Sequence, residues 1–212
     1  MAERRHIKLG VFFNTTGHHV ASWRHPRAQA DAGINFRHHV EMAKTAERGR
    51  FAMIFLADNP TVRDANIEAV SRSAQYIANF EPITLLSALA AVTEKIGLVA
   101  TASTTFNEPY NIARKFASLD WISNGRAAWN IVTTANHAAA KNFGMDQTIE
   151  HHARYERAKE FTRVVQGLWD SWDDDAFVRN KETGQFFRPE GLHTLNHKGP
   201  YPVSYTHLRA HE

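Results

Sequence analysis

Polar side chains recur directly after the apolar segments of this sequence, at positions from which they could bind a ligand. Four groups of polar residues each follow an apolar segment, at 14–19, 58–59, 103–107 and 133–137. A further pair, His151 and Tyr155, stands four residues apart, which places both side chains on one face at the start of a helix. If the apolar segments are parallel strands, their carboxyl ends meet at one edge, where these groups could form a site.

Most of these residues bind by hydrogen bonds. Asp58 could accept a hydrogen bond from a ring N–H or a hydroxyl group, or it could simply cap the next segment. Ser103 and Thr104 offer hydroxyl and backbone groups to a ligand, although both residue types are also common in turns. Asn130 lies within an apolar segment, and a buried amide must find a partner, either a ligand or another side chain.

The segment around His151 and Tyr155 suits an anion. Arg154 lies between them, and the amino end of a helix carries free N–H groups and a partial positive charge. A phosphate group is the anion that such a site commonly binds. The alternative is that Tyr155 belongs to an apolar helical face and is only part of the core.

Strands and helices alternate along the chain. The apolar runs predict four strands, at 7–13, 51–56, 96–101 and 127–133. Helical periodicity and end signals predict four helices, at 36–48, 82–93, 109–122 and 154–172. Because the strands are nearly continuous apolar runs, they fit a parallel sheet that is covered on both faces.

Two α/β architectures compete for this order, a doubly wound open sheet and a (β/α)8 TIM barrel. The first strand is not followed by the GxGxxG turn of a dinucleotide-binding domain. Polar residues collect instead at the strand ends, where a barrel has its active site. We therefore expect a (β/α)8 barrel, of which the first four βα units are present.

Three local patterns give testable detail. Asn35 should cap the first helix and Gly49 should end it, with Val40, Ala43 and Ala46 facing the core. The last helix should bury a stripe formed by Tyr155, Ala158, Thr162, Val165, Trp169 and Trp172. Residues 59–80 should form a polar connection, and residues 173–203 a hairpin insertion with short strands at 176–179 and 185–188.

Composition excludes several classes of protein. The 212 residues carry a net charge of only +3, without a run of Lys or Arg that would indicate nucleic-acid binding. The absence of cysteine excludes disulfides, thiolate zinc sites and cysteine nucleophiles, and it fits a cytoplasmic protein. We find neither a signal peptide nor an apolar run of about 18 residues, and therefore expect no membrane association. A Walker-type phosphate loop is also absent.

Several long stretches resemble one enzyme family. They are LGVFFNTTGHHVASWRHP (9–26), FAMIFLAD (51–58), residues 80–134 with NEPYNIARKFASLDWISNGRAAWNIVTT at their end, RYERAKEFTRVVQGLWDSW (154–172) and LHTLNHKGPYPV (192–203). Together they resemble the nitrilotriacetate monooxygenase group of luciferase-like flavin monooxygenases, from Lys8 to about Val203. Residues 204–212 (SYTHLRAHE) do not continue the pattern. We therefore expect one half-barrel domain over 1–203 and a non-family tail, the result of truncation or of a sequence-assembly error.

The resemblance implies a function and assigns roles to residues. Members take reduced FMN from a separate NAD(P)H:flavin reductase, form a flavin C4a-peroxide with O2, and insert one oxygen atom into a small organic substrate. By analogy, Asp58, Ser103, Thr104, Asn130, His151 and Tyr155 would bind FMN. His18, His137 and Asn14 would be the catalytic, substrate-side candidates, although a lone loop histidine is often only solvated. Full-length members of such families form homo-oligomers.

Three other functions stay open. A barrel reductase that depends on the deazaflavin F420 would share the fold and differ in its cofactor contacts. A metal-dependent barrel hydrolase would account for the 13 histidines, but the sequence has no HExxH motif and adjacent pairs such as His18-His19 cannot share one face. An inactive barrel fragment that only binds ligands is the non-enzyme alternative.

Overall fold

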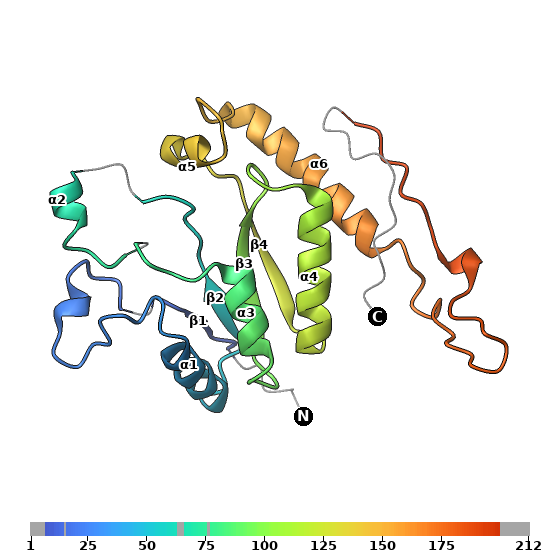
Figure 1. The fold of residues 1–212 in the computed structure, drawn as a ribbon, viewed down its shortest axis with the longest axis horizontal. Helices are drawn as coiled ribbons and strands as arrows, with labels where there is room; N and C mark the ends of the chain where they lie inside the picture. The colour runs from blue at the N-terminus through green and yellow to red at the C-terminus, as the bar shows by residue number, and fades with distance from the viewer. Residues whose placement is uncertain (1–6, 15, 63–65, 76, 200–212) are drawn as a thin grey trace. The chain divides into compact units, whose positions relative to one another are not determined.

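Four strands form one sheet in the computed structural model, which describes residues 7–14, 16–62, 66–75 and 77–199 (Figure 1). The strands are β1 (Gly10–Phe12), β2 (Met53–Leu56), β3 (Gly97–Ser103) and β4 (Ala127–Val132). They lie in the order β1-β2-β3-β4, and the pairs β1–β2 and β2–β3 are parallel. Each strand is thus added beside the previous one, as in a barrel, whereas a doubly wound sheet reverses its order after the first strands.

The four predicted helices are present, with small shifts at their ends. They are α1 (Phe36–Arg48), α3 (Pro82–Ala90), α4 (Pro109–Ser123) and α6 (His151–Trp169). Two short helices were not predicted, α2 (Ile67–Val70) and α5 (His137–Asn142). Each begins at an asparagine cap, Asn66 or Asn136. Short 3-10 turns occur at Ser22–Arg24 and Pro189–Gly191.

The ends of α1 follow the sequence signals with one correction. The side chain of Asn35 accepts a hydrogen bond from the N–H of His38 at 3.1 Å, as expected of a cap. Gly49 follows the helix with φ −71°, so it is not the left-handed residue. Arg50, with φ 58°, takes that conformation instead. Ala43 and Ala46 face the core as predicted, whereas Val40 is only half-buried and His39 is buried in its place.

The predicted stripe on α6 is displaced by about one residue for most of its members, although Val165 is buried as predicted. Tyr155 is 50% exposed and Trp169 is 38% exposed. The buried side chains of α6 are Arg154, Phe161, Val164, Val165 and Leu168. One residue corresponds to a rotation of about 100° around a helix, which is enough to move Tyr155 from the core to the surface.

A hydrogen-bonded network stabilises the edge of the sheet at which β3 begins. One carboxylate oxygen of Glu47 accepts hydrogen bonds from the N–H groups of Glu94 (2.9 Å), Lys95 (2.6 Å) and Ile96 (3.0 Å). The guanidinium of Arg126 donates five hydrogen bonds, to the carbonyl oxygens of Ala90, Thr93, Ile96 and Ser123 and to the Thr93 hydroxyl. These contacts hold together the end of α1, the α3–β3 connection and the start of β4. We call this group the Glu47–Arg126 network.

The described chain divides into two compact units, and each is described by itself. The first contains the described residues up to Ala102, with Leu119–Ile131 and Asn136–Thr148. Its core includes Ile54, Leu86, Leu89 and Leu98, and its helices α1 and α3 lie on the same side of the strands (Figure 1). The second contains Ser103–Ser118, Val132–Ala135 and the described residues from Ile149 onward.

The segment after α6 folds back on itself as predicted, but the short strands expected at 176–179 and 185–188 are not formed in the described chain, and Arg179 has φ 45°. The N–H of Arg179 donates to the Phe186 carbonyl at 2.9 Å, and the N–H of Arg188 donates to the Ala176 carbonyl at 2.8 Å. An antiparallel bridge joins Asn180 to Gln185. We predict from the sequence that this hairpin is an insertion into a barrel. Residues 200–212, which include the end of the predicted insertion and the predicted tail, lie outside the described residues. None of the helices in the described part of the chain is long and apolar enough to cross a membrane.

Candidate active site

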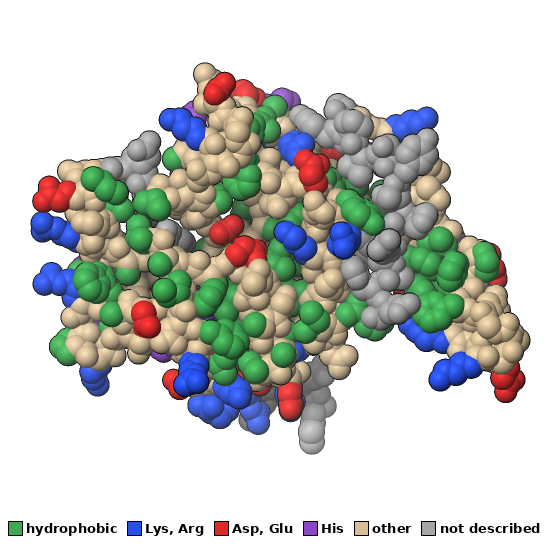
Figure 2. Space-filling view, in the orientation of Figure 1, with side chains coloured by type: hydrophobic (Ala, Val, Ile, Leu, Met, Phe, Trp, Pro, Cys, Tyr) green, Lys and Arg blue, Asp and Glu red, His purple; other side chains and the backbone are tan. Residues whose placement is uncertain are grey.

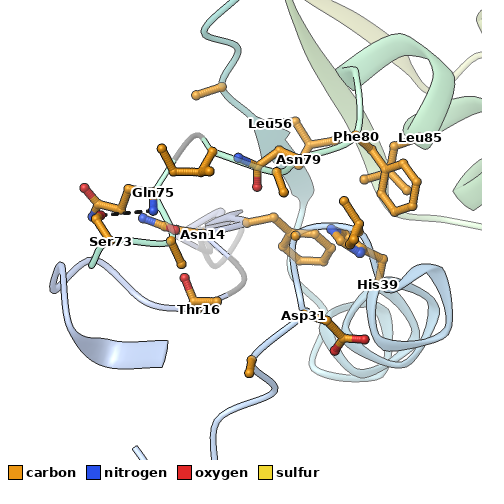
Figure 3. A pocket seen from close by; sticks show the side chains of 18 of the residues that line it. Asn14, Thr16, Asp31, His39, Leu56, Ser73, Gln75, Asn79, Phe80 and Leu85 are labelled. Carbon is orange, nitrogen blue, oxygen red and sulfur yellow. Dashed lines mark hydrogen bonds between the residues drawn. The ribbon is translucent and has the colours of Figure 1, made fainter. Parts of the chain in front are cut away.

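Asn14 lies just beyond β1, in a turn that directs it toward a cavity. Its N–H donates to the Phe12 carbonyl at 3.0 Å, and its own carbonyl accepts from the N–H of Gly17 at 2.8 Å. The backbone groups of Asn14 are therefore engaged. Its side chain lines a cavity of about 190 Å³ beside the ends of β1 and β2 (Figure 3). A substrate-side role for Asn14 is compatible with this position.

Asp58 follows β2 and keeps an accessible carboxyl group. Although the residue is exposed, enough protein surrounds the carboxyl that partial burial raises its pKa, and the nearby negative charge of Glu81 raises it further. Glu81 itself caps α3 by accepting from the N–H groups of Ile83 (3.0 Å) and Thr84 (2.7 Å). Asp58 is not the cap of the next helix, because Asn66 has that role in α2. An accessible carboxyl with a raised pKa at a strand end is a typical functional group.

The two candidate histidines are both exposed. The ring of His18 packs against Phe12, with the ring centres 5.3 Å apart, and its backbone carbonyl accepts from the side chain of Gln75 at 2.6 Å. His137 begins α5, directly after its cap Asn136, and so lies on a helix where we expected a loop. Within the described residues, neither ring makes a hydrogen bond, so both stay accessible to a ligand.

The side-chain amide of Asn130 is hydrogen-bonded within the protein. Its side-chain amide donates to the Thr101 hydroxyl on the neighbouring strand at 2.9 Å. The adjacent Trp129 donates from its indole N–H to the Ala102 carbonyl at 3.0 Å. These contacts match the alternative that another side chain satisfies the Asn130 amide group.

In the second unit, the hydroxyl groups of Ser103 and Thr104 are buried and engaged. The Ser103 hydroxyl accepts from the N–H of Thr105 at 3.1 Å and from the Thr134 hydroxyl at 2.8 Å. The Thr104 side chain, with 0% exposure, donates to the Val132 carbonyl at 3.3 Å. Both hydroxyls therefore join the end of β3 to the end of β4 and the residue pair after it, as side chains of turns often do. Thr105 differs, because its buried hydroxyl has no hydrogen-bond partner among the described residues.

The start of α6 brings His151 and Tyr155 together. Their ring centres are 4.8 Å apart, and both residues are exposed. Arg154 between them is buried and donates to the Ile149 carbonyl at 2.9 Å, while its Nε–H has no partner in the described chain. Glu150 caps the helix by accepting from the N–H of Ala153 at 3.1 Å, a contact that lowers its pKa. An anion here would thus meet side chains more than free helix N–H groups.

One residue near these candidates was not singled out from the sequence. The guanidinium of Arg157, one turn along α6, donates to the carbonyl oxygens of Thr104 (2.9 Å) and Asn107 (3.1 Å). It thereby holds the loop that follows β3. Only its place in a polar, charged helix could have indicated it, since its partners are about 50 residues away.

The described residues contain no group of three histidine, aspartate or glutamate side chains placed to hold a metal ion. The metal-dependent hydrolase therefore gains no support from the geometry. The flavin and deazaflavin alternatives depend on strand-end hydrogen-bonding groups, which the structure does contain.

Comparison with known sequences identifies similar proteins. The family described as luciferase-like monooxygenase matches residues 15–206. An N-acetyl-S-(2-succino)cysteine monooxygenase of Bacillus subtilis (strain 168) is 57% identical over 200 residues, which are 94% of this chain and 44% of that protein. A nitrilotriacetate monooxygenase component A of Aminobacter aminovorans is 45% identical over 207 residues, 95% of this chain and 46% of that protein. The chain thus spans less than half the length of these two relatives.

Solved structures resemble the fold over nearly the whole chain. A long-chain alkane monooxygenase superposes with a TM-score of 0.91 at 34% identity, covering 98% of this chain and 49% of that one. A riboflavin lyase, solved with a modified FMN and riboflavin, superposes with a TM-score of 0.86 at 33% identity, covering 95% of this chain and 46% of that one.

Proposed function

Because the chain belongs to the luciferase-like monooxygenase family, we propose that it forms part of an FMN-dependent monooxygenase of the two-component type. The enzyme would receive reduced FMN from a separate NAD(P)H:flavin reductase and insert one oxygen atom of O2 into a small organic substrate. The bound flavin would supply the activation of O2. The protein's task is to bind the flavin, orient it, exclude water and leave space for substrate.

Asp58 is the observation that supports this proposal most directly. Its carboxyl is accessible, has a raised pKa and caps no helix, so it is available to a ligand at a strand end. A carboxylate at this place can accept hydrogen bonds from a flavin ring N–H or from hydroxyl groups of the ribityl chain. With its pKa raised, it can also hold a proton more readily than an ordinary aspartate.

The family resemblance also assigns residues of the second unit to FMN. The phosphate would meet the side chains of His151 and Tyr155, with the free Nε–H of Arg154 as a further donor. The resemblance assigns Ser103 and Thr104 to the flavin, although their hydroxyls, the Ser103 carbonyl and both backbone groups of Thr104 have partners within the protein. Asn130, which lies in the first unit, would act through Thr101, which it contacts.

The remaining roles follow the same expectation. Asn14, His18 and His137 would face the substrate, where they can orient it or exchange a proton with it. The name of the Aminobacter relative, component A, supports a second component that delivers reduced flavin. A homo-oligomer of the complete barrel and a cytoplasmic location stay predictions from the sequence.

A titration with FMN tests the cofactor assignment. The protein is titrated with oxidised and with photoreduced FMN, and binding is followed by flavin fluorescence and absorbance. We expect Asp58→Asn to weaken the binding of reduced FMN about tenfold, as is usual for loss of a charged hydrogen-bond partner. Asp146→Asn, at an exposed position, is the matched control and should bind as the wild type does. Wild-type affinity in Asp58→Asn would contradict the role of Asp58, and binding of F420 in place of FMN would favour the deazaflavin alternative.

A further inference from the structure

The cavity beside Asn14 has two chemically different ends (Figure 3). Asn14, Ser73 and Gln75 lie at the polar end, while His39, Phe80 and Leu85 lie at the other. Its volume of about 190 Å³ is comparable to that of cavities that bind a benzene ring, roughly 150 Å³. The cavity is therefore large enough for a small organic molecule.

His39 presents a single hydrogen-bond acceptor at the apolar end. The residue is 3% exposed, and its Nδ1 lies 3.0 Å from the Asn35 carbonyl oxygen. Because a carbonyl only accepts, Nδ1 must carry the proton. Burial lowers the pKa of His39, which favours the neutral ring. Its Nε2 is then an unprotonated acceptor, and among the described residues only Asn35 hydrogen-bonds the ring.

Aromatic rings surround this acceptor. The ring centre of Phe80 is 5.5 Å from that of His39 in an edge-on arrangement, and that of Phe13 is 6.4 Å away. Among the described residues that line the cavity, Asp31 is the one charged residue, and hydrogen bonds from Gln29 and Asn35 lower the pKa of its carboxyl. The described lining residues include neither lysine nor arginine. The walls thus disfavour a carboxylate and favour an uncharged molecule.

The loops over the cavity approach each other at Gly33. Its carbonyl accepts from the N–H of Phe80 at 3.3 Å. A methyl group at residue 33 would overlap the carbonyl oxygen of Ala78, so only glycine permits this approach. The close approach keeps Phe80 beside His39.

We propose that this cavity binds a small uncharged organic molecule, such as a phenol, an alcohol or a secondary amide, which donates one hydrogen bond to Nε2 of His39. The apolar part of the ligand packs against Phe13 and Phe80. Asn14, which we propose faces the substrate, lines the same cavity, but the inference concerns binding alone and is tested without flavin.

Three probes of similar shape test the proposal on protein labelled with ¹⁵N-histidine. Phenol has a donor, anisole lacks it, and benzoate is charged. We expect saturable binding of phenol with a change in the ¹⁵N resonance of His39 Nε2, and affinity about fivefold weaker for anisole, as expected for one lost hydrogen bond. Benzoate should not compete with phenol. Equal affinity for phenol and anisole, or effective competition by benzoate, would overturn the proposal.

Variants separate the hydrogen bond from the shape of the cavity. His39→Met should abolish the preference for phenol over anisole while anisole still binds. His38→Met is the matched control, because the neighbouring His38 does not line the cavity, and it should keep the preference. Gly33→Ala should weaken both probes together. An unchanged preference in His39→Met would refute the role of His39, and if that variant does not fold, the three probes on the wild type still decide.

Discussion

Polar groups have different roles at the two edges of the sheet in the first unit, the edge where β3 begins and the edge where β1 and β2 end. At the edge where β3 begins, the Glu47–Arg126 network satisfies backbone groups of the α3–β3 connection and of Ser123 at the end of α4. At the edge where β1 and β2 end, Asp58 has a raised pKa, and the side chains of His18 and His39 keep atoms free for a ligand. Polar groups at the first edge therefore stabilise the fold, whereas those at the second can bind.

Charge follows the same division. Figure 2 shows Lys and Arg side chains gathered at its lower edge, below α1 and α3. Lys44 and Arg48 on α1 and Lys95 before β3 are exposed. Cations near the carboxyl ends of helices interact favourably with the helix dipole. Arg48 lies in the last turn of α1, where its charge has this favourable interaction.

The largest effect should come from Arg126→Met. The change removes five hydrogen bonds and leaves several carbonyl groups without a donor, which should lower the free energy of unfolding by roughly 3 kcal/mol. Urea denaturation of the variant and of the exposed control Lys44→Met measures this. A loss no larger than that of the control would break the contrast between the edges.

Glu47→Gln should have a smaller effect with a characteristic pH dependence. Partial burial acts to raise the pKa of Glu47, but the N–H groups of Lys95, Ile96 and Glu94 and the charge of Arg126 lower it below its ordinary value of 4.5. The carboxylate then contributes stability above pH 4.5 that is lost as the pH falls through the folded-state pKa. We expect a loss of about 1–2 kcal/mol at pH 7. Urea denaturation is measured at decreasing pH for the wild type, for Glu47→Gln and for the control Glu41→Gln. The midpoints of the wild type and Glu47→Gln should converge as the pH falls. A difference between them that stays constant with pH would contradict the role of the Glu47 charge.

Asp58→Asn should change stability in the opposite direction. Because the folded-state pKa of Asp58 lies above the ordinary 3.8, the ionised carboxylate opposes folding once the pH rises above that folded-state value. The variant should be more stable at pH 7 by less than about 0.5 kcal/mol, since solvent screens the group. Below pH 3.8 the gain should vanish. Thermal unfolding at several pH values measures it, and destabilisation at pH 7 would place Asp58 with the structural residues.

His18→Gln should have the smallest effect on stability, within about 0.5 kcal/mol, because the ring is exposed. If His18 faces substrate, the variant should lower the yield of oxygenated product per reduced flavin while flavin binding stays unchanged. His25→Gln, in the same loop, serves as the control. Product yield equal to that of the control would remove His18 from the substrate side.

Most elements were predictable because their signals are local. Continuous apolar runs gave the four strands, and residues such as Asn35 and Pro82 marked helix starts that the structure confirms. The short helices α2 and α5 were missed, since four and six residues are too few to show a helical period. The face of α6 was misplaced because two overlapping apolar patterns differ by one residue, and only packing selects between them.

The candidate site was predictable in part. Strand ends pointed to Asp58 and Asn14, which the structure leaves available to a ligand. The same rule pointed to Thr104 and Asn130, whose side chains the structure pairs with Val132 and Thr101. Position along a strand indicates where a side chain lies, but its hydrogen bonds depend on residues from elsewhere in the chain.

The sequence by itself determined the order of strands and helices, the caps and the family, because these depend on neighbouring residues and on long ordered matches. Tertiary structure alone decided the roles of His39, Glu47 and Arg126. In the contacts that join separate elements, Glu47 and Arg126 bond to residues that lie 30 to 49 positions away in the sequence. Whether a polar side chain stabilises the fold or stays free to bind follows from which distant groups the fold brings within hydrogen-bonding distance.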